Sequence, residues 1–500
     1  MTSITPDPEP APDQAGGIAG FFSKFTVLKS AMRELWLSLA IKLLVYAAYG
    51  LMNSTIALWL MSDFGYSEKK ALALVAFWSL LMTICTLLVG SLTDAIGLRA
   101  TFFLGVGFCI VSRAVMAFTS ASWLALAGGL VPLAIGEALT SPVLIAAIRQ
   151  YSTTKQRSIS FSMIYSMANV GFLIASLLFD FVRRHLGEHG HLNLPGARLS
   201  TYQTLLLVSC LIEFMILPLI FFLREGAEAT DQGVQFNPKQ STHRHQPLLT
   251  GFVLTIRDAA RDTIRIFGSL LKEAGIYRFL IFLMLIAFLK LIFMQMYYVY
   301  PAFGIRVLGD GAPVGTLWAI NSICAILLVP VVGALTQKYS AYKMVTVGAV
   351  ISALSVFIMA LPSAWFEPLA NGFFGQWLGH SWLGLKGGVH PYYVMIAIFV
   401  VLLSVGEAFY SPRVYEYAAA IAPKGQEASY GALSYIPFLL SKLLIGTFSG
   451  LLLAQYCPAQ GERHPETMWL FLALTAAIAP VGLLMLSKVI RLKEAGREED

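Results

Sequence analysis

The chain has 500 residues, of which 57% are hydrophobic and only 13% are charged, whereas an average soluble domain is about a quarter charged. This composition excludes a string of soluble domains, and it excludes a disordered protein, which would be richer in charge and poorer in aromatic residues. The net charge of +7 does not indicate a nucleic-acid partner, because Lys and Arg cluster between apolar runs, as topology signals do.

Residues 1–34 are expected to form a cytoplasmic tail. Residues 1–18 are rich in Pro, Asp, Glu, Ala and Gly, and no basic segment precedes an apolar core there. We therefore interpret them as a flexible tail and not as a cleavable signal peptide.

Apolar runs of about 20 residues predict membrane-spanning helices, six on each side of a central polar segment. The predicted spans are 35–61, 70–92, 99–118, 122–148, 158–182, 203–223, 277–302, 313–336, 343–362, 391–420, 429–455 and 467–487. We expect one six-helix bundle over 35–223 and another over 277–487, with a cytoplasmic linker over 224–276 and a cytoplasmic tail over 488–500. The linker is expected to be flexible over 226–247 and to form an amphipathic surface helix over 249–274.

Basic residues set the predicted orientation. Lys and Arg gather in the linker, in the C-terminal tail and in alternate loops, so both termini should be cytoplasmic. Two long outer loops follow from this topology. The histidine-containing loop 183–202 is interpreted as a flexible polar segment, in preference to a loose metal site. The loop 363–390, with three tryptophans, is expected to rest at the membrane interface.

A glycine-rich turn motif follows the second span, where residues 90–99 read GSLTDAIGLR. It resembles the loop signature of the major facilitator superfamily, G-x-L-x-D-r-x-G-r-r. A partial copy, GALTQK, lies at 333–338, where Gln337 replaces the acidic residue. The resemblance implies twelve spans in two repeated halves with pseudo-twofold symmetry, hence an all-α membrane protein. It also implies a cytoplasmic gate formed by Gly90, Asp94, Gly97 and Arg99.

One phrase occurs in both halves of the chain. Residues 136–142 read GEALTSP and residues 406–412 read GEAFYSP, and the same offset relates Tyr165 to Tyr435. Each copy places a carboxylate, Glu137 or Glu407, inside an apolar helix, which a membrane makes costly. We therefore expect these glutamates to be functional, although a helix-packing role is the alternative. Pro142, Pro412 and Pro437 are expected to interrupt regular helical hydrogen bonding.

The second copy of the phrase also resembles the tenth-to-eleventh helix region of proton-dependent oligopeptide transporters, together with residues 422–425 (APKG) and Gly431. That resemblance implies that Glu407 faces a substrate cavity. The chain departs from the family's pattern at two places. Residues 42–46 read KLLVY where the family has E-x-x-E-R, and Ser141-Pro142 replaces a Lys-Pro pair.

The remaining ionisable residues inside spans complete the predicted site. Each charged side chain at the bilayer centre costs about 2.5–3.5 kcal/mol or more of insertion free energy, unless it forms an ion pair or faces a water-filled cavity. Arg113 and Lys442 are interpreted either as site residues or as partners of a glutamate. Lys290 is the best basic candidate for substrate binding, and Lys42 is close enough to the cytoplasmic end to snorkel.

Polar and aromatic residues on three spans are the other predicted substrate contacts. Tyr46, Tyr49 and Asn53 share one face of the first span, Tyr297 lies on the seventh and Asn321 on the eighth. The alternative for Tyr297 is an interfacial aromatic belt.

These patterns predict a secondary active transporter that works by alternating access, with no enzymatic activity, cofactor or metal. The excess of basic residues at the midplane favours a carboxylate-bearing or zwitterionic solute, such as a peptide or amino acid. Glu407 and Glu137 are the candidates for proton coupling. We expect a monomer in the cell membrane, which is the inner membrane if the source is bacterial. The alternatives are a non-transporting sensor or assembly factor on the same scaffold, and a channel.

Overall fold

The computed structural model describes residues 25–230, 233–236, 274–336, 339–421, 436–444 and 448–491, with single positions between 250 and 268. Residues 1–24 and 492–500 of the predicted tails, and most of the predicted linker helix, lie outside these residues. The described positions between 250 and 268 are helical.

The first half of the chain is a series of helices and one hairpin. Its elements are η1 (Phe25–Ser30), α2 (Arg33–Phe64), α3 (Glu68–Ile96), α4 (Leu98–Phe118), α5 (Ser122–Leu124), the π-helical η2 (Ala125–Leu130), α6 (Val131–Ala138), α7 (Ser141–Gln150), α8 (Thr154–Leu186), β1 (His191–Leu194), β2 (Ala197–Ser200), α9 (Thr201–Phe214) and α10 (Ile216–Phe221).

The second half repeats this helical organisation after a second hairpin. Its elements are β3 (Ala227–Thr230), β4 (Gly233–Phe236), α12 (Ala274–Tyr298), α13 (Tyr300–Leu308), α14 (Val314–Leu335), α15 (Ala341–Phe357), η3 (Ile358–Ala360), η4 (Ser363–Phe366), α16 (Glu367–Asn371), α17 (Phe373–Gln376), the π-helical η5 (Trp377–Trp382), α18 (Pro391–Ile421), α20 (Ile436–Leu444), α21 (Gly450–Tyr456), α22 (Pro465–Met485) and α23 (Ser487–Ile490).

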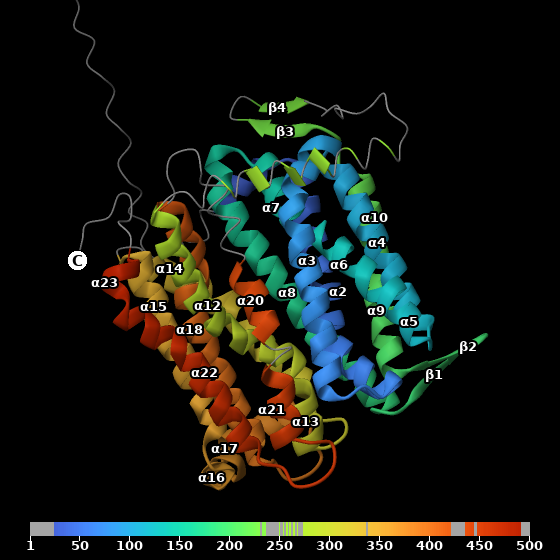
Figure 1. The fold of residues 1–500 in the computed structure, drawn as a ribbon, viewed down its shortest axis with the longest axis vertical. Coiled ribbons are helices and arrows are strands. Elements are labelled where there is room, and N and C mark those ends of the chain that lie inside the picture. Colours follow the sequence, from blue (N-terminus) through green and yellow to red (C-terminus); the bar gives the residue numbers. More distant parts are fainter. Residues whose placement is uncertain are drawn as a thin grey trace, which may run out of the picture.

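Within the part of the chain that the structure describes, eleven helical segments are long and apolar enough to cross a membrane. They coincide with eleven of the predicted spans. The twelfth prediction, 429–455, includes undescribed residues, and its described parts are α20 and α21. The protein is therefore an all-α membrane protein in which two groups of tilted helices stand side by side, α2–α10 in one and α12–α22 in the other (Figure 1).

Helix interruptions follow the local sequence. The fourth span breaks between α6 and α7, directly ahead of Pro142, and the seventh breaks at Val299, ahead of Pro301. Each proline stands in the first turn of the following helix. Proline lacks a backbone N–H and its ring clashes with the carbonyl four residues earlier, which explains both breaks. Pro412 lies inside the continuous helix α18, where its missing N–H removes one helical hydrogen bond without ending the helix. Neighbouring helices that pack around a proline can hold it within a continuous helix.

Two segments that we expected to be flexible contain β-hairpins. In the loop 183–202, β1 pairs antiparallel with β2, with Leu194 opposite Ala197. Between them lies Pro195-Gly196, in which Gly196 has φ 83°, and a Pro-Gly pair of this kind favours a tight turn. In the linker, β3 pairs with β4. The two hairpins lie at opposite ends of the molecule, β3–β4 at the top and β1–β2 at the bottom of Figure 1.

The repeated glycine has a packing role in both halves. A Cβ on Gly136 of α6 would meet Cys109 Sγ of α4 at 2.6 Å, and a Cβ on Gly406 of α18 would lie 2.8 Å from the Gly348 carbonyl oxygen of α15. Only glycine permits these crossings. The glutamate that follows each glycine is thereby held at a fixed place beside a closely packed helix pair.

Candidate functional site between the two bundles

Glu407 lies near the middle of α18 and has polar partners in both halves of the molecule. Its Oε2 accepts a hydrogen bond from Asn321 Nδ2 of α14 at 3.0 Å. Its Oε1 accepts one from the Tyr165 hydroxyl of α8 at 3.2 Å. The Glu407 side chain is buried, so these bonds offset part of its desolvation cost. A change in the distance between the halves would break the Tyr165 bond.

Lys290 of α12 supplies a positive charge close to Glu407. The two groups interact electrostatically, and Lys290 Nζ donates to Ser411 Oγ at 3.3 Å. The ammonium also lies 4.9 Å from the ring centroid of Tyr410. The cluster thus contains an acidic and a basic group that belong to the same bundle and interact with each other.

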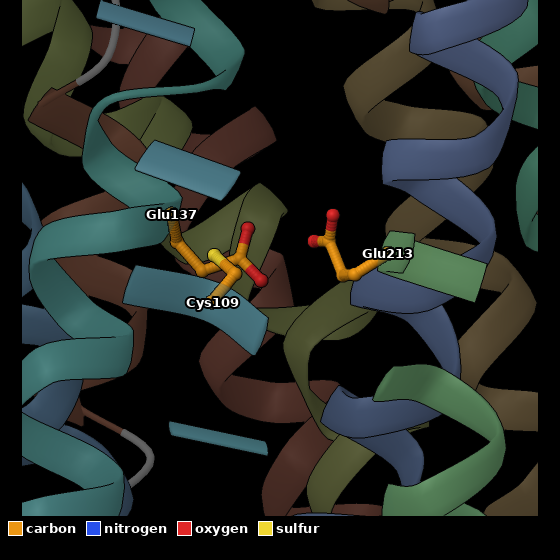
Figure 2. Close-up of side chains that lie close together, drawn as sticks. All are labelled: Cys109, Glu137 and Glu213. Atoms are coloured by element: carbon orange, nitrogen blue, oxygen red, sulfur yellow. The ribbon is translucent and has the colours of Figure 1, made fainter. Parts of the chain in front are cut away.

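Glu137 lies in a different environment, inside the N-terminal half. Arg113 of α4 donates through Nη2 to Glu137 Oε1 at 2.5 Å and through Nη1 to Glu213 Oε1 of α9 at 3.0 Å. All three side chains are buried. Figure 2 shows the two carboxylates with Cys109 beside Glu137. The expected common site of Glu137, Glu407, Lys290 and Arg113 is thus divided into two polar clusters.

The second cluster has the composition of a small metal site but the bonding of an ion-pair network. Ligand atoms of Cys109, Glu137 and Glu213 lie within 4.8 Å of one another. The Arg113 guanidinium, however, already bridges the two carboxylates and supplies the positive charge that a metal would bring. The geometry therefore fits a buried salt bridge and not a cation site.

Side chains of the C-terminal half contact the first span of the N-terminal half. Lys442 Nζ of α20 donates to the Tyr49 hydroxyl of α2 at 3.2 Å, and Lys442 also interacts electrostatically with Glu137. The Tyr298 hydroxyl of α12 donates to Asn53 Oδ1 of α2. The predicted residues Tyr49 and Asn53 thus lie at the boundary between the bundles.

Aromatic rings line the same boundary. Phe172 of α8 lies between Tyr46 of α2, at 5.1 Å between ring centroids, and Tyr297 of α12, at 5.8 Å. The Tyr46 hydroxyl shares a hydrogen bond with Ser141 Oγ at 3.1 Å, and the Lys42 ammonium lies 3.8 Å from the centroid of the Tyr46 ring. Tyr297 therefore packs inside the protein and not in an interfacial belt.

The bundles are fastened together at the end that carries β1–β2. Asp180 of α8 accepts hydrogen bonds from the Gly315 amide at 3.0 Å, the Thr316 amide at 2.6 Å and the Thr316 hydroxyl at 2.7 Å. These amides belong to the first turn of α14, whose N-cap residue, Pro313, makes no side-chain cap. Asp180 thus caps a helix of the opposite bundle, where the helix dipole favours a carboxylate.

Arg183 extends this contact. We call Asp180 and Arg183, together with their partners Ala312, Gly315 and Thr316 at the start of α14, the Asp180 lock. Arg183 Nη1 donates to Asp180 Oδ1 at 3.1 Å and to the Ala312 carbonyl at 3.2 Å. A further bond between the bundles at this end joins Arg306 of α13 to Glu68 of α3 at 2.7 Å. Together these bonds hold the β1–β2 end of the interface closed.

The predicted gate residues lie at the other end of the N-terminal half. Gly97 separates α3 from α4 with φ 87°, which explains the need for glycine there. Arg99 donates to the Phe221 carbonyl at 2.9 Å and so binds the end of α10 in its own bundle. Gly90 and Asp94 are part of α3, but their side chains lie outside the described part, and the proposed clamp stays a prediction.

Three further polar residues of these sites were not predicted from the sequence. Tyr165 was noted only as part of the repeat, and Glu213 and Asp180 were overlooked although each lies within a predicted span. The sequence does contain a signal for Glu213 and Asp180, because burying a carboxylate within an apolar membrane-spanning run costs free energy wherever it occurs. The partners of all three residues lie on distant helices, and the sequence does not reveal them.

Comparison with known families identifies the fold. A family model described as Major Facilitator Superfamily matches residues 39–384. No curated protein sequence matches the chain.

Solved transporters share the fold over nearly the whole chain. A POT family transporter in complex with 5-aminolevulinic acid has 15% sequence identity and a TM-score of 0.67, with 92% of this chain and 97% of that chain covered. A structure concerned with substrate recognition in proton dependent oligopeptide transporters has 17% identity and a TM-score of 0.65, with 92% and 99% covered. A bacterial homologue of the human drug peptide transporters has 16% identity and a TM-score of 0.64, with 92% and 98% covered.

Proposed function

The chain belongs to the major facilitator superfamily, and we propose that it is a secondary active transporter of a small zwitterionic or carboxylate-bearing solute, peptide-like or amino-acid-like. The two bundles rock about the Glu407 cluster, which opens alternately to the two sides of the membrane. The observation that carries this proposal is the position of Glu407 beside Lys290, with a bond to Tyr165 in the opposite bundle.

The chemistry of the cluster supports this substrate class. A substrate carboxylate would pair with the Lys290 ammonium, and a substrate amino group would pair with the Glu407 carboxylate. Asn321 and Tyr165 would orient the Glu407 oxygens. The structural relatives support the same class, since one was solved with 5-aminolevulinic acid and another with a thioalcohol-conjugated peptide.

The Asp180 lock supports an alternating-access cycle. It joins the bundles at one end, and its bonds must break when that end opens. We assign this end to the outside of the cell membrane, with both termini in the cytoplasm, because basic residues gather in the central linker and in the C-terminal tail.

Glu407 is proposed to couple transport to protons. Its partners lie on two bundles, so its environment changes when the bundles move. Glu407→Gln should abolish uptake driven by a proton gradient in proteoliposomes. Counterflow exchange should be weakened by the loss of the carboxylate that pairs with the substrate amino group, but it should persist. The matched control is Glu462→Gln, since the Glu462 side chain is 85% exposed in a loop. Gradient-driven uptake by Glu407→Gln at the wild-type rate would refute the coupling role.

The solute can be found before transport is assayed. A thermal-shift screen of amino acids, short peptides, organic acids and drugs should identify compounds that raise the melting temperature, because ligand binding stabilises the folded state. A compound that stabilises the protein but does not cross the membrane in proteoliposomes would favour a sensor over a transporter.

A further inference from the structure

The cluster of Arg113, Glu137 and Glu213 contains more negative than positive charge. Its two carboxylates share a single guanidinium, and the three side chains are at most 3% exposed. If both carboxylates are ionised, the trio has a net charge of −1 inside the N-terminal bundle. A buried excess charge is unstable without a counter-charge or a proton.

Lys442 is that counter-charge, and it belongs to the other half of the protein. Its ammonium acts on Glu137 while it is held by the Tyr49 hydroxyl and lies 4.9 Å from the Trp78 ring centroid. With Lys442 in place, the four groups sum to zero. A movement of α20 away from α2 would return the trio to its negative excess.

Glu213 is the weaker-bound carboxylate of the pair. Glu137 receives the shorter hydrogen bond from Arg113, at 2.5 Å against 3.0 Å for Glu213, and it also interacts with Lys442. Among the described residues, Glu213 Oε2 and Arg113 Nε have no hydrogen-bond partner although both are buried. Other titratable groups also face the two carboxylates. The thiols of Cys109 and Cys210 interact with Glu213, and the hydroxyls of Tyr46, Tyr49 and Tyr298 interact with Glu137. A proton arriving at the cluster therefore goes to Glu213.

We propose that Arg113, Glu137 and Glu213 form a proton-binding site within the N-terminal bundle, in which Glu213 is protonated when Lys442 moves away from Glu137 and is deprotonated when Lys442 returns. The oxygen that has no partner in the present arrangement, Glu213 Oε2, receives the proton. This inference rests on the proposed rocking of the bundles. It adds a second proton site, on the opposite half from Glu407, in a chain whose first span reads KLLVY where the oligopeptide transporters have E-x-x-E-R.

The substitution Lys442→Met removes the ammonium charge, as a movement of Lys442 away from Glu137 would, and the test therefore needs no substrate. Infrared spectra of the purified full chain at neutral pH should show an added carboxylic-acid carbonyl band in Lys442→Met, equivalent to a single carboxyl group per chain. The band should vanish in the double variant with Glu213→Gln. The isosteric glutamine keeps the side-chain volume, and a sharp thermal transition will confirm that each variant is folded.

Lys290→Met is the matched control, because it removes the lysine beside the other glutamate. Any carboxylic-acid band that Lys290→Met produces should disappear when it is combined with Glu407→Gln and should remain when it is combined with Glu213→Gln. No added band in Lys442→Met would overturn the proposal. So would a band that survives Glu213→Gln and is lost with Glu137→Gln, since the proton would then be on Glu137. Because the spectra do not depend on flux, their failure is distinguishable from a failure to transport.

Discussion

Replacing Asp180 with alanine is expected to release the β1–β2 end of the interface. The substitution removes three hydrogen bonds that a carboxylate receives from α14 of the opposite bundle. Water replaces these bonds when the end opens, so we count each at about 1–1.5 kcal/mol, the upper half of the range for a net hydrogen bond. The closed arrangement therefore loses roughly 3–4.5 kcal/mol, which changes the ratio of closed to open molecules by roughly a hundred- to a thousandfold.

The distance between the bundles at this end reports the change directly. Spin labels at Lys69 and Asn371, both exposed, can be measured by double electron–electron resonance after the native cysteines are replaced. Asp180→Ala should convert a predominantly short distance into a predominantly long one. Thr316→Ala removes only the hydroxyl bond and should shift the ratio by about tenfold or less.

Asp310→Ala is the control, because Asp310 is exposed in the loop before α14. Its distance distribution should match that of the wild type. If Asp180→Ala also left the distribution unchanged, the three bonds would not distinguish the closed from the open arrangement. The Asp180 lock would then be a static contact and not a gate.

Three other outcomes are expected. Gly406→Ala should destabilise the protein by about 1–3 kcal/mol, because the added Cβ meets α15. The control Gly107→Ala, whose added Cβ has open space around it, should leave the melting temperature unchanged or raise it. Equal melting temperatures for the two variants would contradict the packing role of Gly406. His390 Nδ1 accepts a hydrogen bond from the Tyr392 amide at 3.2 Å, and burial lowers the pKa of His390 in the folded protein. As pH falls, the unfolded chain therefore takes up the proton before the folded chain does. The free energy of unfolding should then decrease as pH falls through about 6.5, the ordinary pKa of histidine. His390→Asn should then have a flatter melting profile below neutral pH, and parallel profiles would rule this effect out. A double-mutant cycle between Glu68→Gln and Arg306→Gln, read in the same distance measurement, should return a coupling of about 1 kcal/mol, and a coupling of zero would remove this pair from the closed interface.

The sequence by itself determined the class of protein and most of the spans. Hydrophobic length is a property of consecutive residues, so a run long enough to cross a bilayer can be recognised without knowing what packs against it. Eleven of the predicted spans correspond to helices that meet this requirement. The hairpins β1–β2 and β3–β4 were missed because two short strands in polar segments carry little of this signal.

The roles of the two repeated glutamates were decided by the tertiary structure. The repeated segments 136–142 and 406–412 share a glycine, Gly136 or Gly406, that permits the same close helix crossing in each half. The carboxylates beside them diverge: Glu137 pairs with Arg113 inside its bundle, and Glu407 bonds to Tyr165 across the interface. Each of these partners stands on another helix, and helix rotation and packing decide which side chains meet. A charge inside a span therefore indicates from sequence that a partner must exist, but only the packed helices show which partner it is.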